Sequence, residues 1–494
     1  MADDQAAAIE FLSRGKDGEA KPRRIDTHSS IVFLAGDRVF KIKRAVKYSF
    51  LDYSTLADRQ RYCRAEFDLN RRTAPALYRG VHLLTRAQAG GIEWDGAGEP
   101  VEAVLEMARF ADDALFDRLA ETGRLTPALM VKLGDIVAAF HDKAEETPRF
   151  GGRDGIAAVI ADNHENLIAG SPPLSRERVV ALRAASTQAL ARHGESLDER
   201  RRRGRVRRCH GDLHLRNICL FNGEPTLFDC IEFSDDIACI DTLYDFAFLL
   251  MDIEHRRLRP LGNIVFNRYF DRSDEMSGLA ALPLLMSVRA GVRAKVASAA
   301  AESAAYLDLA LALLQPAAPR LVAVGRLSGS GKSTVAAGVA GDFAPAPGAR
   351  HIRSDVLRKT LTGVAPETRL PAPAYSPEMS ARVYRTLRAE AAASLAAGYT
   401  AVVDATFMDP AERAAIAEVA AKAGTAFTGL WLTAPDTVLL ERVAKRRGDA
   451  SDADQQVLKD QLRADVGTVS WGKIDVSGDI GATLAAARRA VAMA

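Results

Sequence analysis

The chain has 494 residues, of which 48% are hydrophobic and 26% charged, so it can form two to four globular domains of about 100–200 residues each. Its formal net charge of +2 gives no argument for binding nucleic acid or a membrane surface. The five cysteines form no CxxC pair, and an odd count in a long chain does not suit a disulfide framework, so we expect buried free thiols and no structural zinc site.

The chain begins with MADDQAAAIEFL, which has acidic side chains where a signal peptide has basic ones. No apolar run approaches the ~20 residues of a membrane span, so we expect a cytoplasmic protein without membrane association. Residues 1–24 read as a short helix and a polar lead-in. From Ser29 to Lys43 the pattern becomes strand-like, and Ala35-Gly36-Asp37 lies where a hairpin turn would join two apolar runs.

Further elements are expected from the spacing of apolar residues. In chain order they are a helix at 56–73, a strand at Val101–Phe110, long helices near 112–143 and 174–197, a β-rich stretch at Val206–Phe233, and helices from Leu243 to about Leu314. The first part of the chain therefore mixes strands and helices without regular alternation.

The best linker is the proline-punctuated segment Gln315-Pro316-Ala317-Ala318-Pro319. A new strand begins at Leu321, and strands then alternate with helices, which is typical of an α/β domain with a parallel sheet. We therefore predict a lead-in at 1–24, a first domain at 25–314, a linker at 315–320 and a second domain at 321–494.

Three polar side chains stand out in the first domain. Asp212 follows His210-Gly211, Asn217 comes five residues later, and Asp229 ends a predicted strand. Phosphoryl transfer explains this set, because a carboxylate must orient or accept the proton of the attacking hydroxyl while oxygen ligands hold Mg²⁺ against the phosphates of ATP. The alternative is that all three side chains have a structural role only.

The segment resembles the aminoglycoside phosphotransferase-like kinases, whose signature HGDxxxxN matches His210-Gly211-Asp212 and Asn217. The resemblance implies an α+β bilobal kinase-like fold. It also implies that Asp212 is the catalytic base and that Asn217 and Asp229 are magnesium ligands. Asp229-Cys230-Ile231 stands where related protein kinases have DFG.

The same resemblance assigns nucleotide-binding residues. Lys41 lies on a predicted strand where a kinase has its phosphate-pairing lysine, but Lys43 projects from the same strand face and stays an alternative. Glu66 is the expected ion-pair partner, although an ordinary surface ion pair is a rival interpretation. Glu106 and Met107 are expected to form the hinge against adenine.

Several other polar features belong to this domain. The nucleotide-covering segment Thr27-His28-Ser29-Ser30 lacks GxGxxG and departs from the kinase pattern. Asp241 either supports the catalytic loop or caps a helix. Glu232, with Asp235 and Asp236, could contribute to an acidic pocket for a polycation. For the basic run Arg200–Arg208 we expect exposed arginines rather than an RNA site, because no aromatic stacking set accompanies it.

A second nucleotide motif follows the linker. An apolar strand leads into Gly325-Arg326-Leu327-Ser328-Gly329-Ser330-Gly331-Lys332-Ser333-Thr334 and then a helix, which is the context of a P-loop. Backbone N–H groups from Gly329 to Thr334 would surround the β-phosphate at the helix N-terminus. Lys332 would reach the β- and γ-phosphates, and Ser333 would offer its hydroxyl to Mg²⁺. The strict pattern has Gly where this chain has Arg326, so we expect binding with some strain or an altered loop entry.

The layout after the P-loop resembles kinases of the adenylate kinase type, a group that includes gluconate kinase, zeta toxins, chloramphenicol phosphotransferase and polynucleotide 5′-kinases. The resemblance implies a base at Asp355, acceptor-binding side chains at Arg358 and Arg413, a carboxylate near the metal at Asp404, and lid arginines at Arg442 and Arg446. Solvated helix faces are the alternative for these arginines.

The whole arrangement, over residues 25–475, resembles a class of bacterial two-domain proteins. Our leading hypothesis is an ATP- and Mg²⁺-dependent bifunctional kinase that transfers the γ-phosphate to a hydroxyl group of a small molecule. One alternative is a nucleic-acid 5′-end kinase, and another is that one module senses nucleotide without turnover. The acceptor, a preference for ATP over GTP and the oligomeric state stay open.

Overall fold

The computed structural model describes residues 2–15, 21–48, 51–170, 174–445 and 450–492. The chain divides into two compact units, which are described separately. Unit 1 contains Met1–Ala158 and Leu197–Asp252, and unit 2 contains Val159–Ser196 and Ile253–Ala494. The predicted domain boundary at 315–320 stays a prediction.

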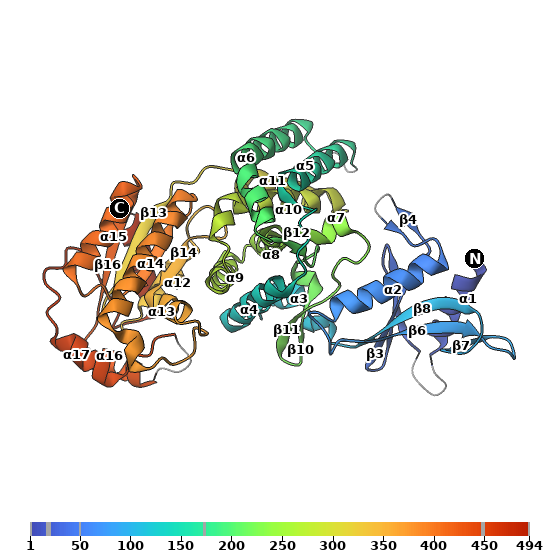
Figure 1. Ribbon diagram of the computed structural model, residues 1–494, viewed down its shortest axis with the longest axis horizontal. Coiled ribbons are helices and arrows are strands. Elements are labelled where there is room, and N and C mark those ends of the chain that lie inside the picture. The colour runs from blue at the N-terminus through green and yellow to red at the C-terminus, as the bar shows by residue number, and fades with distance from the viewer. Residues whose placement is uncertain (1, 16–20, 49–50, 171–173, 446–449, 493–494) are drawn as a thin grey trace. The chain divides into compact units, whose positions relative to one another are not determined.

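Unit 1 begins with an antiparallel sheet of six strands in the order β1-β2-β3-β8-β6-β7. Figure 1 labels β3, β6, β7 and β8 of this sheet. The six strands are β1 (Arg23–Asp26), β2 (Ser30–Ala35), β3 (Arg38–Lys43), β6 (Tyr78–Arg86), β7 (Ile92–Trp94) and β8 (Pro100–Ala108). The predicted hairpin is confirmed, because Ala35 pairs with Arg38 across a two-residue turn in which Gly36 has φ +57°.

One helix packs on each face of this sheet. Helix α2 (Leu56–Asn70) contributes Cys63 and Phe67 to a core with Leu105 and Met107 of β8. Helix α1 (Ala2–Arg14) contributes Ala8 and other apolar residues to a core on the opposite face, with Ile42 and Val104. Because strand side chains alternate between faces, Lys41 lies on the α2 face, where the predicted site is.

The rest of unit 1 is mainly helical, with short strands around the HGD segment. The helices include α3 (Phe116–Glu121), α4 (Pro127–Lys143), the short α7 (Asp235–Ala238) and α8 (Thr242–His255), the last of which continues into unit 2. The short strands are β9 (Val206–Arg208), β10 (Ile218–Phe221), β11 (Glu224–Leu227) and β12 (Cys239–Asp241). The hairpin β10–β11 ends just before Asp229, and β9 leads into His210.

Unit 2 contains a parallel sheet of five strands in the order β14-β15-β13-β16-β17. Figure 1 labels β13, β14 and β16 of this sheet. The five strands are β13 (Arg320–Gly325), β14 (Arg350–Arg353), β15 (Ala401–Ala405), β16 (Ala426–Thr433) and β17 (Gly472–Asp475). This confirms the predicted α/β P-loop fold class. Strand β13 is apolar from Leu321 to Val324 because it is covered on both faces: Leu321 and Ala323 face one core, and Val322 and Val324 face the other.

Helices cover both faces of this sheet. Helices α14 (Pro377–Ala396) and α15 (Pro410–Lys422) pack on one face, and α12 (Lys332–Ala340) and α18 (Ile480–Ala492) pack on the other. The remaining helices of this region are α13 (Ser354–Leu361), α16 (Asp436–Lys445) and α17 (Gln455–Arg463). Unit 2 also holds α9 (Arg259–Arg272), α10 (Leu282–Val296), α11 (Ala300–Leu313) and parts of α5 (Gly152–Ala169) and α6 (Arg176–Arg202).

The basic run before the HGD segment is not wholly exposed. Arg200 has a side chain that is 1% exposed, and it forms an ion pair with Asp241, with N–O distances of 2.8 and 2.7 Å. Asp241 also accepts the N–H of Leu243 at 2.8 Å, at the start of α8. The expectation of solvated arginines is therefore wrong for Arg200, because a carboxylate 41 residues later compensates its buried charge.

Two further expectations concerned the cysteines and membrane-spanning helices. The expectation of free thiols is confirmed, since all five cysteines are free and buried. Among the described residues, no helix combines the length and the apolar character that a membrane-spanning segment needs.

Candidate active sites

Hydrogen bonds to Asp245 of helix α8 hold the HGD segment (His210-Gly211-Asp212) in place. The N–H groups of His210 and Gly211 donate to the two carboxylate oxygens of Asp245 at 3.0 and 2.9 Å, and His141 donates to the same carboxylate at 3.1 Å. Asp245 is fully buried. Gly211 has φ +83°, and a Cβ there would lie 3.0 Å from the side chain of Ile231, so this loop position requires glycine.

Asp212 and Asn217 lie together at the end of this loop. The Asn217 amide donates to Asp212 Oδ2 and to the Asp212 carbonyl oxygen, each at 2.9 Å. His214 Nε2 is 3.3 Å from the same Oδ2. The Asp212 side chain is 36% exposed, so it is oriented by neighbours and still reaches solvent. This is a suitable environment for a carboxylate that must meet an incoming hydroxyl group.

His210 connects this loop to the Asp229 segment. Its Nδ1 accepts the N–H of Asp212 at 3.3 Å, and its Nε2 donates to the carbonyl oxygen of Phe228 at 2.9 Å. These bonds define the neutral tautomer with the proton on Nε2, and burial lowers the pKa of His210. The histidine therefore fixes the catalytic loop against the residue that precedes Asp229.

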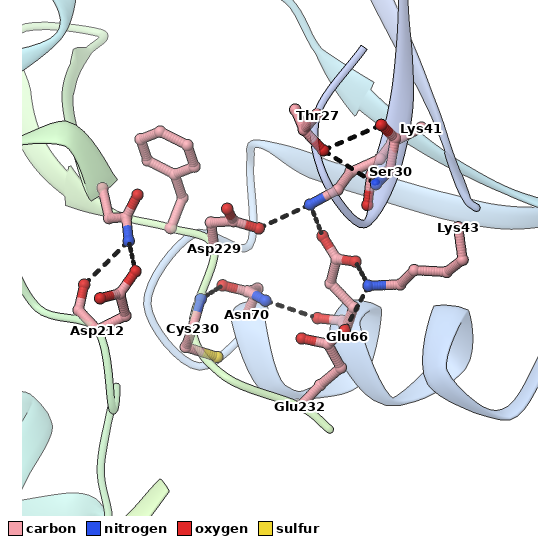
Figure 2. A network of polar contacts seen from close by, with 12 residues as sticks. Thr27, Ser30, Lys41, Lys43, Glu66, Asn70, Asp212, Asp229, Cys230 and Glu232 are labelled. Atoms are coloured by element: carbon pink, nitrogen blue, oxygen red, sulfur yellow. Dashed lines mark hydrogen bonds and ion pairs between the residues drawn. The ribbon is translucent and has the colours of Figure 1, made fainter. Parts of the chain in front are cut away.

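Helix α2 also holds the Asp229 segment. Asp229 has φ +61°, a left-handed backbone conformation that is uncommon for residues other than glycine. Its N–H donates to the Tyr78 hydroxyl oxygen at 3.1 Å, and the next N–H, of Cys230, donates to Asn70 Oδ1 at 2.9 Å. Asn70 in turn donates to the carbonyl oxygen of Glu66, as Figure 2 shows. Side chains of α2 and β6 therefore fix the backbone at Asp229, the candidate magnesium ligand.

Both candidate lysines contact Glu66 (Figure 2). Lys41 Nζ lies 2.7 Å from Glu66 Oε1 and 2.7 Å from Asp229 Oδ1. Lys43 Nζ lies 2.5 Å from Glu66 Oε2 and also forms an ion pair with Glu232. The side chain of Glu66 is 1% exposed, so this is a buried network and not the surface ion pair considered as a rival.

Glu232 does not contribute to an exposed acidic pocket. Its side chain is 6% exposed and is bound by Lys43 and by the Tyr53 hydroxyl, which lies 2.5 Å from Oε1. The expectation that Glu232 faces a polycationic acceptor is therefore wrong, because its charge is used inside the network. Asp235 and Asp236 are exposed, and Asp235 pairs with Arg208 at 2.9 Å.

The charges of this network stabilise one another. Burial lowers the pKa of Lys41, but the carboxylates of Asp229 and Glu66 outweigh it and raise that pKa. For Lys43, Glu232 and Glu66 likewise outweigh burial and raise the pKa. Burial raises the pKa of Glu66, but the two ammonium groups bring it below its ordinary value. Both lysines are therefore cationic and Glu66 is anionic at neutral pH.

The predicted hinge residues face opposite sides of the sheet. Met107 lies in the core on the α2 face, which is also the face of Lys41. Glu106 points the other way and lies 3.0 Å from His82 Nε2 and 3.6 Å from Arg38. A nucleotide on the Lys41 side would therefore meet the side chain of Met107 and not that of Glu106.

The nucleotide-covering segment is closed by side chains instead of glycines. Thr27 Oγ1 both accepts the N–H of Ser30 and donates to its carbonyl oxygen, each at 2.9 Å (Figure 2). The hydroxyl of Tyr48 donates to the His28 carbonyl oxygen at 3.1 Å. A compact threonine turn therefore stands where related kinases have a glycine-rich loop.

The P-loop has the backbone that its motif requires. Gly329 and Gly331 both have φ +81°, and Gly331 is the N-cap of α12. Arg326, where the strict pattern has Gly, has φ +156°, and its guanidinium lies over the ring of Trp431 at 5.8 Å. The altered loop entry is thus compatible with a P-loop conformation in which the arginine packs on an aromatic ring.

The side chains of the P-loop lie at the start of α12. Lys332 Nζ donates to the carbonyl oxygen of Leu327 at 3.1 Å, across the loop, and Ser333 Oγ accepts from Arg353 at 3.2 Å. Ser330 is fully buried, whereas Thr334 is exposed. Gln461 of α17 accepts the N–H of Ser328 at 2.9 Å, which ties the loop to this helix.

Asp404 and Asp355 lie near Lys332 and Arg353. Asp404, on β15, is 4% exposed and accepts from His351 Nε2 at 3.0 Å. Burial raises the pKa of Asp404, but the His351 hydrogen bond and nearby cations lower it to about 2. Asp355 lies in the first turn of α13 and not on the strand itself. Burial raises its pKa, against the charge of Lys332. One carboxylate is therefore held ionised and the other is made more basic.

The predicted arginines differ in their surroundings. Arg413 donates to four backbone carbonyl oxygens, of Phe407, Met408, Val466 and Thr468, so its side chain holds loops together. Arg358 donates to the Ala374 carbonyl oxygen at 2.8 Å and lies over the ring of Tyr375. Arg442 donates to the Val476 carbonyl oxygen at 2.7 Å, and Arg446 lies outside the described residues.

Sequence reasoning missed several residues that shape the two sites. Asp245 and Asn70 hold the first site, while His351 and Gln461 support the second. Only Asp245 had a signal in the sequence, because it lies close to Asp241 in a segment already considered as support. The others act through contacts between distant parts of the chain.

Two family models match the parts of the chain that contain the two motifs. A family model described as Phosphotransferase enzyme family matches residues 54–282, and one described as AAA domain matches residues 321–464. A gluconokinase from Sinorhizobium meliloti 1021 is 23% identical, with 36% of this chain and 94% of that chain covered and a TM-score of 0.26. A choline/ethanolamine kinase family protein from Mesorhizobium loti is 16% identical, with 64% and 95% covered and a TM-score of 0.39.

A relative matches across both parts of the chain. The uncharacterized protein Rv2004c of Mycobacterium tuberculosis is 31% identical over 456 residues, which are 87% of this chain and 88% of the relative. The chain therefore belongs to the same family as this mycobacterial protein, a family of two-domain bacterial proteins with an aminoglycoside phosphotransferase-like N-terminal kinase domain and a C-terminal P-loop kinase domain.

Proposed function

We propose that the protein is an ATP-dependent phosphotransferase with two nucleotide-binding modules, and that it moves the γ-phosphate of ATP to a hydroxyl group of a small molecule. The observation that carries the proposal is the Lys41 ammonium, which lies 2.7 Å from both Glu66 and Asp229. Phosphoryl transfer in protein kinases requires a lysine paired with a helix glutamate and a nearby aspartate that binds Mg²⁺, and Lys41, Glu66 and Asp229 would supply these three groups.

The first site fits Mg²⁺ by the chemistry of its donors. Asn217 offers an amide oxygen and Asp229 a carboxylate whose side chain is 45% exposed, and both are hard oxygen ligands. Bound Mg²⁺ would neutralise charge on the phosphates during transfer. Lys41 would bind the phosphates, with Glu66 holding its ammonium in place, while Met107 would line the adenine side.

Asp212 is the proposed base of the first site. Its carboxylate would take the proton of the acceptor hydroxyl while Asn217 and His214, at 2.9 and 3.3 Å from Oδ2, keep it oriented. His210, held neutral by its two hydrogen bonds, positions this loop and does not exchange a proton with the acceptor. Proton transfer by a positioned carboxylate contributes about 10²–10⁴-fold to a rate.

The P-loop module has a second set of roles. Lys332 would bind the phosphates together with the backbone N–H groups from Gly329 to Thr334. Ser333 and Asp404 fit the magnesium side because both offer oxygen donors next to Lys332 and Arg353. Asp355 would be the base, since its raised pKa suits a proton acceptor.

The arginines of this module have weaker support. Arg358 and Arg442 stay candidates for binding the acceptor and the transferring phosphoryl group. We do not include Arg413, because its donors are used by four carbonyl oxygens. A cytoplasmic location is part of the proposal, because both modules would draw on cytoplasmic ATP.

A nucleic-acid acceptor has less support. The basic run that could bind RNA phosphate is partly used inside the fold: Arg200 pairs with Asp241, and Arg207 donates to the carbonyl oxygens of His141 and Ala144. A nucleic-acid kinase would also show affinity that falls steeply with salt.

The test is transfer of labelled γ-phosphate from Mg·ATP by the full chain to pooled sugars, aminoglycosides, nucleosides and short RNA ends. Asp212→Asn and Lys332→Ala run beside the wild type, with Asp236→Asn as an exposed control. We expect a labelled small molecule whose formation one of the two site variants abolishes and the control does not. A chain that binds ATP and labels no acceptor would favour the nucleotide-sensing alternative.

A further inference from the structure

Helix α9 covers the edge of the parallel sheet in unit 2 that strand β14 forms. Strand β14 is an edge strand, and α9 belongs to the same compact unit although it precedes the linker in the sequence. Asn267 of α9 accepts the backbone N–H of His351 at 2.8 Å and donates to the Ala349 carbonyl oxygen at 3.1 Å. One amide side chain thus makes the two kinds of hydrogen bond that a neighbouring strand would supply.

A buried arginine strengthens this contact. Arg350 is 2% exposed and donates to Asn267 Oδ1 at 2.6 Å and to Asp271 at 3.1 Å. Its guanidinium also lies over the rings of Phe266 and Phe270, at 5.9 and 5.4 Å. A buried guanidinium needs compensating partners, and most of the partners found here come from α9.

A second polar contact extends the attachment before β14. Asn263, one turn earlier on α9, donates to the carbonyl oxygens of Pro347 and Ala349 at 3.2 and 3.0 Å. Asn263 and Asn267 are both buried. Because both side-chain amides are buried and hydrogen-bonded, a shift of α9 along the strand would leave these polar groups without partners. The two asparagines therefore specify one register of α9 on the strand.

His351, whose backbone N–H is bound by Asn267, also contacts Asp404 in the P-loop site through its side chain. The backbone N–H of His351 is bound by Asn267, and the His351 side chain donates to Asp404 at 3.0 Å. Asp404 is the carboxylate assigned to the magnesium side of the second site. The path from α9 to this carboxylate therefore consists of two hydrogen bonds and one residue.

We propose that α9 is a structural part of the P-loop module and that Asn267 is a positioning residue for Asp404, acting through His351. The second half of this proposal rests on the proposed nucleotide binding at Lys332. It follows that the P-loop module extends in sequence beyond the linker, into the part matched by the phosphotransferase family model at 54–282. Groups that orient a metal-facing carboxylate typically change metal affinity or activity by about 10–100-fold when removed.

The experiment uses the full chain carrying Asp229→Ala, so that ATP binding reports the P-loop site. Asn267→Leu removes both the acceptor of the His351 N–H and the donor to the Ala349 carbonyl oxygen. Asn267→Asp keeps the acceptor and loses the donor. Asp271→Asn weakens the same interface through Arg350 without touching His351. The Mg²⁺ concentration that gives half-maximal ATP binding is measured for each variant, and thermal unfolding is measured beside it.

We expect Asn267→Leu to raise the required Mg²⁺ concentration by about tenfold. Asn267→Asp should restore it to within about threefold, and Asp271→Asn should lower thermal stability with less than a threefold change in Mg²⁺ requirement. Equal effects of Asn267→Leu and Asp271→Asn would reduce Asn267 to a structural role, and an unchanged Mg²⁺ requirement in Asn267→Leu would overturn the positioning claim.

A second readout does not depend on nucleotide. Amide hydrogen exchange at Ala349–Ile352 should accelerate in Asn267→Leu relative to Asn267→Asp. If Lys332→Ala, introduced into the Asp229→Ala chain, leaves ATP binding unchanged, the proposed function of this module fails. The exchange data still decide whether α9 holds β14. Unchanged exchange in Asn267→Leu would overturn the attachment itself.

Discussion

The Lys41 ammonium lies as close to Asp229 as to Glu66, at 2.7 Å from each carboxylate. Lys41 therefore contacts the proposed magnesium ligand directly. If Mg²⁺ and ATP bind as proposed, Lys41 would exchange Asp229 for phosphate. Lys43 would then keep Glu66 in place, since it lies 2.5 Å from the other carboxylate oxygen.

The two lysines should therefore respond differently to substitution. Lys41→Met should reduce Asp212-dependent phosphoryl transfer by about 100-fold or more, because it removes a cation that faces the phosphates. The loss of stability should be smaller than in Lys43→Met, since Lys43 still contacts both Glu66 and Glu232, and Asp229, the other partner of Lys41, is 45% exposed. Enzyme assays and urea unfolding of the same preparations separate the two effects.

Lys43→Met is the matched variant. It leaves Glu232 buried with an uncompensated charge, so the free energy of unfolding should fall by about 3–5 kcal/mol. A Lys43→Met chain as stable as wild type, or a Lys41→Met chain with full activity, would reverse the roles assigned to the two lysines.

Asp245→Asn should loosen the catalytic loop. An asparagine can accept one of the N–H groups of His210 and Gly211 but places its own N–H₂ against the other, and a buried unsatisfied donor costs about 1–3 kcal/mol. We expect this loss of stability together with reduced phosphoryl transfer. The exposed Asp236→Asn should stay within about 0.5 kcal/mol of wild type in the same denaturation series. Equal behaviour of the two variants would contradict the role of Asp245.

The motifs of both sites were predictable from the sequence because each is local. His210 to Asn217 and Gly325 to Thr334 carry their chemistry within ten residues, and their strand and helix context follows from apolar spacing. Strand alternation also placed Lys41 and Lys43 on one face, but it could not distinguish them, because their partners Asp229 and Glu232 lie far along the chain.

Burial of charge was less predictable. Arg200 looks like any other arginine of its run, and only the fold brings it to Asp241. Arg413 was expected at the acceptor but is used by carbonyl oxygens of two loops, one of them more than fifty residues later. In both cases a distant partner decides the role of the side chain, and no local pattern encodes that partner.

The stability of unit 1 should depend on pH through Glu66. Its pKa is lowered in the folded state, so the unfolded chain binds a proton more readily below the ordinary value of 4.5, and stability falls as the pH drops through this range. Glu66→Gln lacks this contribution. The difference in unfolding free energy between wild type and variant should therefore shrink from about pH 6 to about pH 3.5. Urea titrations at several pH values would measure it, and a constant difference would be inconsistent with a charged Glu66.

Two P-loop glycines allow a matched comparison. Gly329 and Gly331 share φ +81°, so alanine at either position costs about 1–2 kcal/mol of backbone strain. A Cβ on Gly329 would also lie 2.8 Å from the Leu439 carbonyl oxygen, whereas a Cβ on Gly331 meets nothing within 4 Å. Gly331→Ala should weaken ATP binding at this site by about tenfold, and Gly329→Ala by more. Calorimetry in the Asp229→Ala chain measures both, and the reverse order would refute the assigned loop geometry.

We propose that one chain holds two Mg·ATP sites, one around Lys41 and Asp229 and one around Lys332. The binding stoichiometry of a non-hydrolysable ATP analogue with Mg²⁺, measured by calorimetry on the full chain, tests this proposal. We expect two molecules per chain, one in Asp229→Ala, one in Lys332→Ala and none in the double variant. A single site in the wild type, or undiminished binding in the double variant, would contradict it.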